Sequence, residues 1–98
     1  MSIVIDPEGK EIDALRQLAH WRGARVLEFG CGDGRLTLRL AQLGARVVAL
    51  DPKPSLIRKA RRELPKQFAT LIKYYIGSAG KLKHPAGSMD RVVFAWSL

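Results

Sequence analysis

Val26-Leu27-Glu28-Phe29-Gly30-Cys31-Gly32-Asp33-Gly34-Arg35-Leu36 is the stretch that decides the fold. It runs from an apolar segment, through three alternate glycines, into an amphipathic segment. This order predicts a strand, a tight turn and the start of a helix, which together form the first half of a βαβ unit of the kind that binds nucleotides.

Periodic segments on both sides of this stretch extend the pattern. Strands are predicted at residues 25–29, 47–51, 71–76 and 91–96, and helices at 36–43 and 55–64, the latter ended by Pro65. An earlier helix is predicted from the Asp6-Pro7-Glu8 start signal to Gly23, whereas residues 2–6 carry too little pattern for an assignment. The alternation of strands and helices predicts an α/β domain with a parallel sheet in the order 3-2-1-4.

The fourth predicted strand raises the question of whether the sheet continues beyond it. Residues 91–96 are apolar on both faces and would form the edge of the sheet, where an open strand promotes aggregation. We therefore expect residues 1–98 to be a single domain truncated after the fourth strand. The alternative is that another chain covers this edge, which would make it a surface for self-association.

Composition narrows the class of protein. Ninety-eight residues suffice for one compact domain, and the single cysteine excludes an intrachain disulfide, so a reducing cytoplasm is expected. There is no apolar run long enough for a membrane span and no signal-peptide pattern. The net charge of +8 fits nucleic-acid binding, an anionic membrane surface or a merely solvated basic surface, and the absence of a nucleic-acid motif favours the last.

The ligand of the glycine turn can be argued from charge. Dinucleotide-binding turns have the spacing G-x-G-x-x-G, whereas here the third glycine comes one place early and Arg35 stands where the pattern needs Gly or Ala. Glu28 precedes the first glycine by two residues, and its carboxylate would repel a pyrophosphate. A ligand with an ammonium group, a sulfonium and no phosphate suits this turn better, and S-adenosylmethionine has that composition; NAD is disfavoured.

Asp51 is the second feature that indicates a nucleoside-containing ligand. It ends the second predicted strand, about twenty residues beyond the glycines, at the position that meets a ribose in this architecture. A carboxylate there can accept hydrogen bonds from both ribose hydroxyls. The structural alternative is an ordinary Asp-Pro turn.

These motifs resemble those of the class I, Rossmann-like S-adenosylmethionine-dependent methyltransferases. Residues 26–34 resemble the E-x-G-x-G-x-G motif of that family, and residues 47–51 resemble its acidic second strand. Residues 77–92 align without gaps to G-D-A-x-x-L-P-F-P-x-x-S-F-D-x-V, which is typical of the small-molecule, ubiquinone/menaquinone-type branch. The resemblance implies a three-layer α/β/α fold, here incomplete, and methyl transfer to a small-molecule acceptor.

The resemblance also implies roles for individual residues. The glycines and Cys31 would surround the methionine moiety with Glu28 near its amino group, Asp51 would hold the ribose, and Pro52 and Lys53 would flank the adenosine. Ser78 and Ala79 would lie against the adenine, although the family usually has Asp at the position of Ser78. Lys83 and His84 also depart from the family's Pro-Phe pair.

Other chemistry-bearing residues give weaker signals. Cys31 lacks a patterned base and is better explained as a small hydrophobe in the turn than as a nucleophile. His20 and His84 lack metal-ligand spacing, and no metal is expected. No general base can be named, and Ser97 is the only candidate on the acceptor side. A basic nucleic-acid-associated module or an RNA-directed methyltransferase remains the alternative function.

Overall fold

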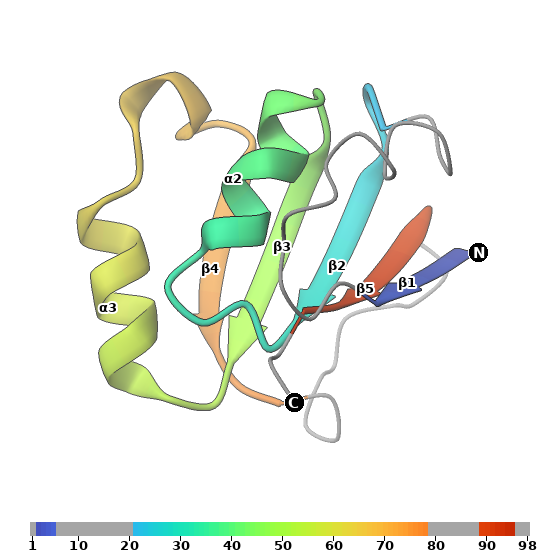
Figure 1. Ribbon diagram of the computed structural model, residues 1–98. Coiled ribbons are helices and arrows are strands. Elements are labelled where there is room, and N and C mark those ends of the chain that lie inside the picture. Colours follow the sequence, from blue (N-terminus) through green and yellow to red (C-terminus); the bar gives the residue numbers. More distant parts are fainter. Residues whose placement is uncertain (1, 6–20, 79–88, 96–98) are drawn as a thin grey trace.

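The computed structural model describes residues 2–5, 21–78 and 89–95, and these form one parallel sheet of five strands (Figure 1). The strands are β1 (Ser2–Ile5), β2 (Arg25–Phe29), β3 (Arg46–Asp51), β4 (Ile72–Ile76) and β5 (Arg91–Phe94). Their order across the sheet is β1-β5-β2-β3-β4. Counted from β2, this confirms the predicted order 3-2-1-4 and adds β1 beyond the fourth strand.

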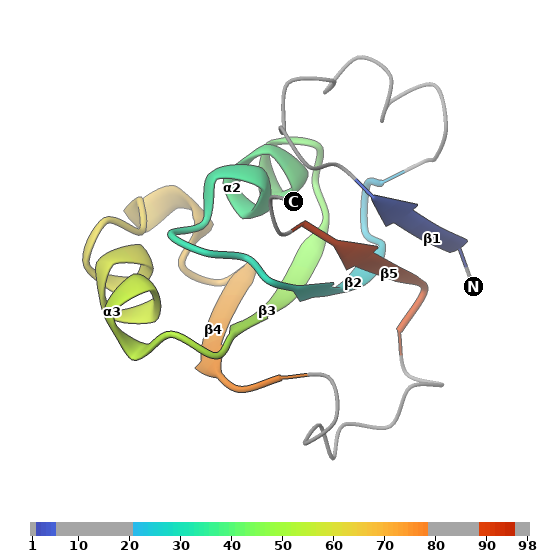
Figure 2. The ribbon, with the colours of Figure 1, turned by 60° about the horizontal axis from the view of Figure 1, so that its bottom comes forward.

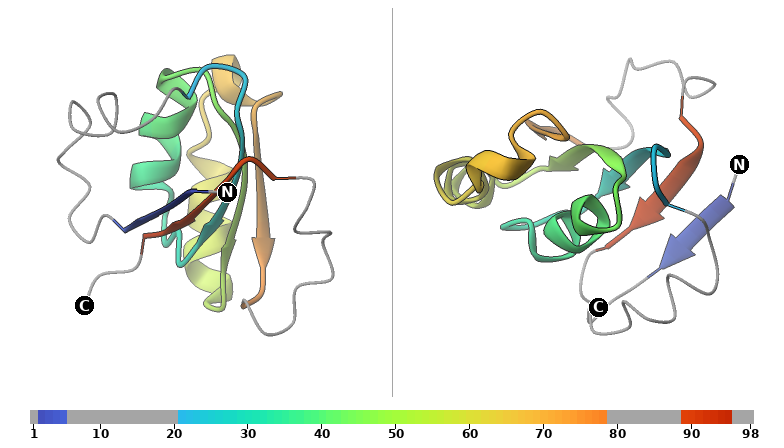
Figure 3. Two further views of the ribbon diagram at one scale, coloured as in Figure 1. Left: turned by 90° about the vertical axis from the view of Figure 1, so that its right-hand side faces the viewer. Right: turned by 90° about the horizontal axis from the view of Figure 1, so that it is seen from above.

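Two helices, α2 (Arg35–Gln42) and α3 (Pro54–Arg62), pack on the same face of the sheet (Figures 1 and 3). They confirm the helices predicted at residues 36–43 and 55–64. The second ends earlier than predicted, and a short 3-10 turn, η1 (Lys66–Phe68), follows. The early end agrees with Pro65, because a proline disfavours helical backbone in the residue before it. In the described residues, no helix has the length and apolar content to cross a membrane. The helix predicted between Asp6 and Gly23 lies mostly outside the described residues.

The central strands are buried on both faces, as the sequence predicts. Val26 on β2 is 0% exposed on the helical side, and its neighbour Leu27 is 2% exposed on the other side. The helical side holds the larger core, made of Leu36, Leu40, Val47, Ala49, Ile57, Ala60, Ile72, Tyr74, Val93 and smaller neighbours. On the opposite side, the rings of Phe29 and Phe94 stack with centroids 5.5 Å apart. These contacts pack β5 against β2 on both faces of the sheet.

The prediction that the strand at residues 91–96 forms the edge is wrong. β1 pairs with β5 in parallel along its whole length, from Ser2 opposite Arg91 to Ile5 opposite Phe94. The edge is therefore covered by the chain's own N-terminal segment, which is short but consists largely of β-branched residues that favour strands. The predicted strand also ends at Phe94, and Trp96 lies outside the described residues.

β4 is the other edge strand of the described sheet, and a side chain protects it. The backbone groups of Leu71 and Gly77 form hydrogen bonds with β3. In a parallel pair, alternate residues bond to the neighbouring strand, so the odd-numbered residues of β4 face β3. The backbone carbonyl of Tyr74, an even-numbered residue, therefore points away from the sheet. The guanidinium of Arg61 on α3 donates a hydrogen bond to this carbonyl at 2.6 Å. A strand edge whose carbonyl is occupied is a poorer template for pairing with another chain.

The carboxyl ends of all five strands lie at one end of the sheet. The connection from β2 to α2 and the connection from β3 to α3 both leave from this end (Figure 2). In open α/β sheets, ligands bind outside the carboxyl ends of the strands where the chain order reverses, which here is between β2 and β5.

Candidate functional site

The turn after β2 is held by its own backbone. The amides of Gly30 and Cys31 both donate to the carbonyl of Leu50 on β3, at 2.8 and 3.0 Å. The amide of Gly34 donates to the carbonyl of Cys31 at 3.0 Å, and Gly34 is the N-cap of α2 with a φ of 93°. The glycine at this position adopts a left-handed conformation that other residues rarely adopt. The turn is therefore fixed against the end of β3.

Asp51, the last residue of β3, completes this arrangement. Its Oδ2 accepts a hydrogen bond from the Gly32 amide and its Oδ1 accepts one from the Lys53 amide, both at 2.9 Å. The residue is 7% exposed. Because each carboxylate oxygen has a second lone pair, Asp51 can still accept hydrogen bonds from a ligand. The residue predicted to bind the ribose thus also positions the glycine turn.

Glu28 lies on the helical face of β2 and is 0% exposed. Its Oε1 accepts a hydrogen bond from the Thr37 hydroxyl at 2.5 Å, while its Oε2 is buried with no hydrogen-bond partner among the described residues. Burial raises the pKa of Glu28 to about 7, against the opposing effect of the Thr37 hydrogen bond. Glu28 therefore lies beneath the surface of the candidate site and is not exposed at it.

Thr37 and Tyr74 join Glu28 in the buried cluster, and the sequence interpretation gave neither of them a role in the site. Tyr74 on β4 is 5% exposed, and its side chain forms a hydrogen bond with Thr37. Burial is the main cause that raises the pKa of Tyr74, so the phenol stays neutral. A Cβ added at Gly34 would overlap the Tyr74 hydroxyl, which explains the third glycine by packing. Thr37 could have been noticed as the polar residue on the apolar face of its helix.

Cys31 is 6% exposed, and its thiol is not activated. Burial, followed by the negative charges of Glu28 and Asp51, raises the pKa of Cys31 well above its usual range. Because the thiolate is the reactive form, this environment disfavours nucleophilic chemistry. The geometry agrees with a small residue that fills the turn.

The remaining predicted site residues surround the same end of the sheet. Pro52 and Lys53 are exposed directly after β3, and Ser78 is exposed two residues after Ile76, which pairs with Asp51. Ala79 lies outside the described residues, as do Ser97, Lys83 and both histidines. The described candidates therefore come together at the ends of β2, β3 and β4.

The polarity of this turn differs from that of a phosphate-binding turn. Phosphate-binding turns direct free amides at the anion. Here the amides of Gly30, Cys31, Gly32 and Gly34 all donate to acceptors within the protein. Around them lie three carboxylates, those of Glu28, Asp33 and Asp51, whose charges all act on Cys31. Nothing lies within 4 Å of the position that a Cβ on Gly32 would occupy, so a ligand has room to approach the backbone there. The turn is suited to a cationic group.

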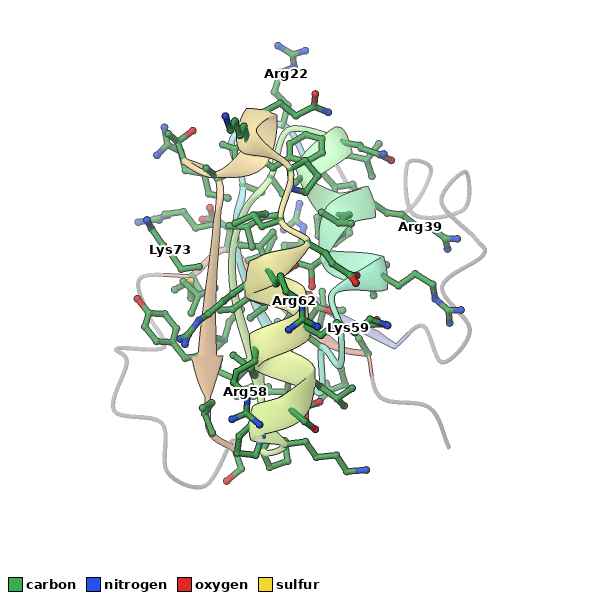
Figure 4. The ribbon with its side chains drawn as sticks, turned by 90° about the vertical axis from the view of Figure 1, so that its left-hand side faces the viewer. Arg22, Arg39, Arg58, Lys59, Arg62 and Lys73 are labelled. Atoms are coloured by element: carbon green, nitrogen blue, oxygen red, sulfur yellow. The ribbon has the colours of Figure 1, made fainter. Side chains whose placement is uncertain are left out.

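The outer surface of the helices has the opposite charge. Arg58, Lys59 and Arg62 project from α3 and are exposed (Figure 4). Five acidic residues lie in the described part of the chain. Glu28 and Asp51 are buried, and the other three are on the surface. Two of those form ion pairs at 3.3 Å, Asp33 with Lys59 and Asp90 with Arg25. The basic charge of this surface is therefore little compensated by described neighbours.

Comparisons with known proteins identify the family of the chain. The methyltransferase domain family matches residues 26–98. The chain is 40% identical over 77 residues to a magnesium-protoporphyrin O-methyltransferase of Rhodobacter capsulatus, an alignment that covers 78% of this chain and 33% of that protein. It is 42% identical over 71 residues to a ubiquinone biosynthesis O-methyltransferase of Methylocella silvestris, covering 72% of this chain and 27% of that protein. The chain thus spans between about a quarter and a third of the length of these relatives.

Solved structures show the same fold. An S-adenosylmethionine-dependent methyltransferase from Mesorhizobium loti superposes with a TM-score of 0.71 at 30% identity, over 84% of this chain and 38% of that chain. Magnesium protoporphyrin IX methyltransferase from Synechocystis with bound SAM gives a TM-score of 0.73 at 21% identity, over 90% of this chain and 44% of that chain. At that lower identity the similarity concerns the fold alone.

Proposed function

Because this chain belongs to the methyltransferase domain family and has the Rossmann-like fold of the class I enzymes, we propose that it binds S-adenosylmethionine at the Gly30–Gly34 turn. We further propose that the protein transfers a methyl group to a small-molecule acceptor. The acceptor class rests on the relatives, which are named for methylation of magnesium protoporphyrin and in ubiquinone biosynthesis.

The observation that carries the proposal is the hydrogen bonding of the turn. Four amides of the turn already donate hydrogen bonds within the protein, so they are not free to bind a diphosphate. The carboxylates of Glu28, Asp33 and Asp51 favour a cation. When bound, S-adenosylmethionine supplies a methyl group activated by its sulfonium. The chain's own contribution is to hold and orient the cofactor, which is the main requirement of an in-line displacement.

Individual roles follow from position. Asp51 would accept hydrogen bonds from the ribose hydroxyls, and the open backbone at Gly32 would lie against the methionine portion. Pro52 and Lys53 would flank the adenosine, and Ser78 with Ala79 would lie near the adenine. Glu28 would balance the positive charge through space from its buried position. No described residue is assigned as a general base.

We also propose a cytoplasmic location. The single cysteine of the chain is a buried thiol with a raised pKa, which suits a reducing compartment. Separation of cells into cytoplasmic and membrane fractions would test this placement.

Calorimetric titration of the purified chain tests the central proposal. S-adenosylmethionine and its demethylated product should both bind, and NAD should not. Binding of NAD in preference to S-adenosylmethionine would overturn the assignment. Titration of a Gly32→Val variant, which blocks approach to the backbone, should show no binding, whereas retained binding would remove the turn from the site.

A further inference from the structure

Thr37 is placed where a helix normally carries an apolar residue. It is the third residue of α2, it is 0% exposed, and it faces the sheet between Leu36 and Leu40 of the core. A buried threonine can satisfy its hydroxyl on its own helix by bonding a carbonyl one turn earlier. Here the hydroxyl instead crosses to β2 and donates to Glu28 Oε1 at 2.5 Å.

The bond matters because Glu28 has so few other partners. Its second oxygen is buried without a hydrogen bond among the described residues. A buried carboxylate with one unsatisfied oxygen is costly, and the cost falls on the charged form. The hydrogen bond from Thr37 favours the charged form.

No cation among the described groups compensates the Glu28 charge. Two neutral groups come from neighbouring elements, the Thr37 hydroxyl from α2 and the Tyr74 phenol from β4. The turn contributes the neutral Cys31 thiol and the negatively charged Asp33 carboxylate. β3 contributes the carboxylate of Asp51. On β5, Val93 pairs with Glu28, and Arg91 lies over the Trp21 ring, 5.8 Å from its centroid. Asp33 pairs with Lys59, so the cluster contains two carboxylates, Glu28 and Asp51, that no described ion pair compensates, at the turn where a ligand would bring a positive charge.

We propose that Thr37 is a positioning residue of this site: its hydroxyl holds the Glu28 carboxylate oriented and available to balance a cationic ligand, so that cofactor binding is coupled to loss of a proton from Glu28. This inference rests on the proposed binding of S-adenosylmethionine. The proton passes from the Glu28 carboxyl to the buffer, and no covalent bond of the ligand changes.

The coupling has a measurable size. With a pKa of about 7, Glu28 is about half protonated at pH 7 in the free chain, and a bound positive charge favours the carboxylate. Binding of S-adenosylmethionine should release about half a proton at pH 7 and almost none at pH 8.5. Calorimetric titrations in two buffers of different ionisation enthalpy measure this number directly.

A matched pair of variants isolates the hydroxyl. Thr37→Ser keeps it, and Thr37→Val replaces it with a methyl group of similar size. Thr37→Ser should bind S-adenosylmethionine with the pH profile of the wild type. Thr37→Val should need a pH higher by about one unit for the same affinity, which is about fivefold weaker binding at pH 7, where the wild-type Glu28 is itself half protonated. The two variants should converge near pH 9.

The outcomes separate this inference from the proposed function. Equal pH profiles for Thr37→Ser and Thr37→Val would overturn the positioning role while leaving cofactor binding intact. If Thr37→Val does not fold, proton release measured on the wild type tests the coupling. Binding without proton release at pH 7 would overturn it. If the wild type binds no S-adenosylmethionine at any pH, the proposed function fails and the coupling fails with it.

Discussion

The Asp51 carboxylate lies 2.9 Å from the amide of Gly32, so the end of β3 is bonded to the middle of the turn that follows β2. The same side chain bonds the amide of Lys53 immediately before α3. One residue thereby fixes two neighbouring connections at the carboxyl end of the sheet. Its structural and binding roles can be separated by substitution.

Replacement of Asp51 should weaken cofactor binding, and the loss should be larger for Asp51→Ala than for Asp51→Asn. Asp51→Ala removes the acceptors for both amides and for the ribose, and we expect a loss of about 1.5–3 kcal/mol in binding free energy to S-adenosylmethionine, the scale of a charge-assisted hydrogen bond. Asp51→Asn keeps one acceptor and the side-chain size, so its loss should be smaller. Calorimetry on both variants checks the order, and unchanged affinity in Asp51→Ala would remove the residue from the site.

Glu28 should make the free chain less stable as the pH rises. Its folded pKa of about 7 lies above the ordinary value of 4.5, so the folded state binds more protons than the unfolded state between these pH values. The unfolding free energy should therefore fall from pH 4.5 to pH 7 by up to about 3 kcal/mol from this group, at about 1.4 kcal/mol per pKa unit. Urea denaturation across this range should show the slope in the wild type and lose this contribution in Glu28→Gln. Identical slopes would mean that Glu28 is charged in the folded chain throughout.

Substitutions at the glycines of the turn should have different effects. An added Cβ at Gly34 overlaps the Tyr74 hydroxyl, so Gly34→Ala should destabilise the fold by about 2–3 kcal/mol from overlap and a φ of 93°. Tyr74→Phe in the Gly34→Ala background should recover about 1 kcal/mol, because the overlapping hydroxyl is gone while the backbone strain remains. Thermal denaturation of the two single variants and the double variant completes the cycle.

Gly32→Ala is the matched control for that experiment. A Cβ at Gly32 meets no atom within 4 Å, so the cost should be limited to the backbone strain at a φ of 58°, about 1 kcal/mol. The fold should persist while affinity for S-adenosylmethionine falls. Equal destabilisation by Gly32→Ala and Gly34→Ala would show that the Tyr74 hydroxyl does not select glycine at position 34.

Arg61 should protect the chain from association more than from unfolding. Arg61→Ala frees the outward carbonyl of Tyr74 on the edge strand β4. We expect a stability change of less than about 1.5 kcal/mol, the size of one hydrogen bond, but faster aggregation in light scattering at 37 °C. Arg58→Ala removes the same charge from the exposed side of α3 and is the control. Equal aggregation of the two variants would attribute the effect to net charge.

The basic surface of α3 should govern any binding to nucleic acid. Arg58→Gln with Arg62→Gln removes two exposed charges from α3, and retention on heparin should fall to a lower salt concentration. Affinity for S-adenosylmethionine should stay the same, because neither residue contributes to the turn. Steep salt dependence with one RNA in preference to other polyanions would support a nucleic-acid-associated function, whereas equal weak retention of all polyanions would indicate nonspecific charge.

The sequence predicted those parts of the fold that depend on local pattern. The paired central strands, both described helices and the glycine turn follow from periodicity and from residues such as Pro65 and Asp51. β1 was not predicted, because four residues carry little pattern and their partner β5 lies at the other end of the chain. This omission also caused the wrong assignment of β5 as an edge.

The described candidate residues lie together at one end of the sheet as expected, whereas their hydrogen bonds to one another were not predicted. Glu28 was expected near the amino group of the cofactor, and the structure buries it completely and joins it to Thr37. Tyr74 was given no role in the site, and its hydroxyl lies where a Cβ on Gly34 would be. Such contacts join residues from three different elements, and a linear pattern contains no information on which side chains meet.

The pairing of β1 with β5 has a consequence for synthesis on the ribosome. β1 emerges first, but its only described partner emerges after β2, β3 and β4 have been made. Until then Ser2–Ile5, which contains three apolar residues, has no strand to pair with. Nascent chains are recognised by chaperones at this stage. Non-local pairing of this kind also slows folding, so β1 should dock after β2, β3 and β4 have paired, and a fusion to β1 that hinders this docking should lower the soluble yield.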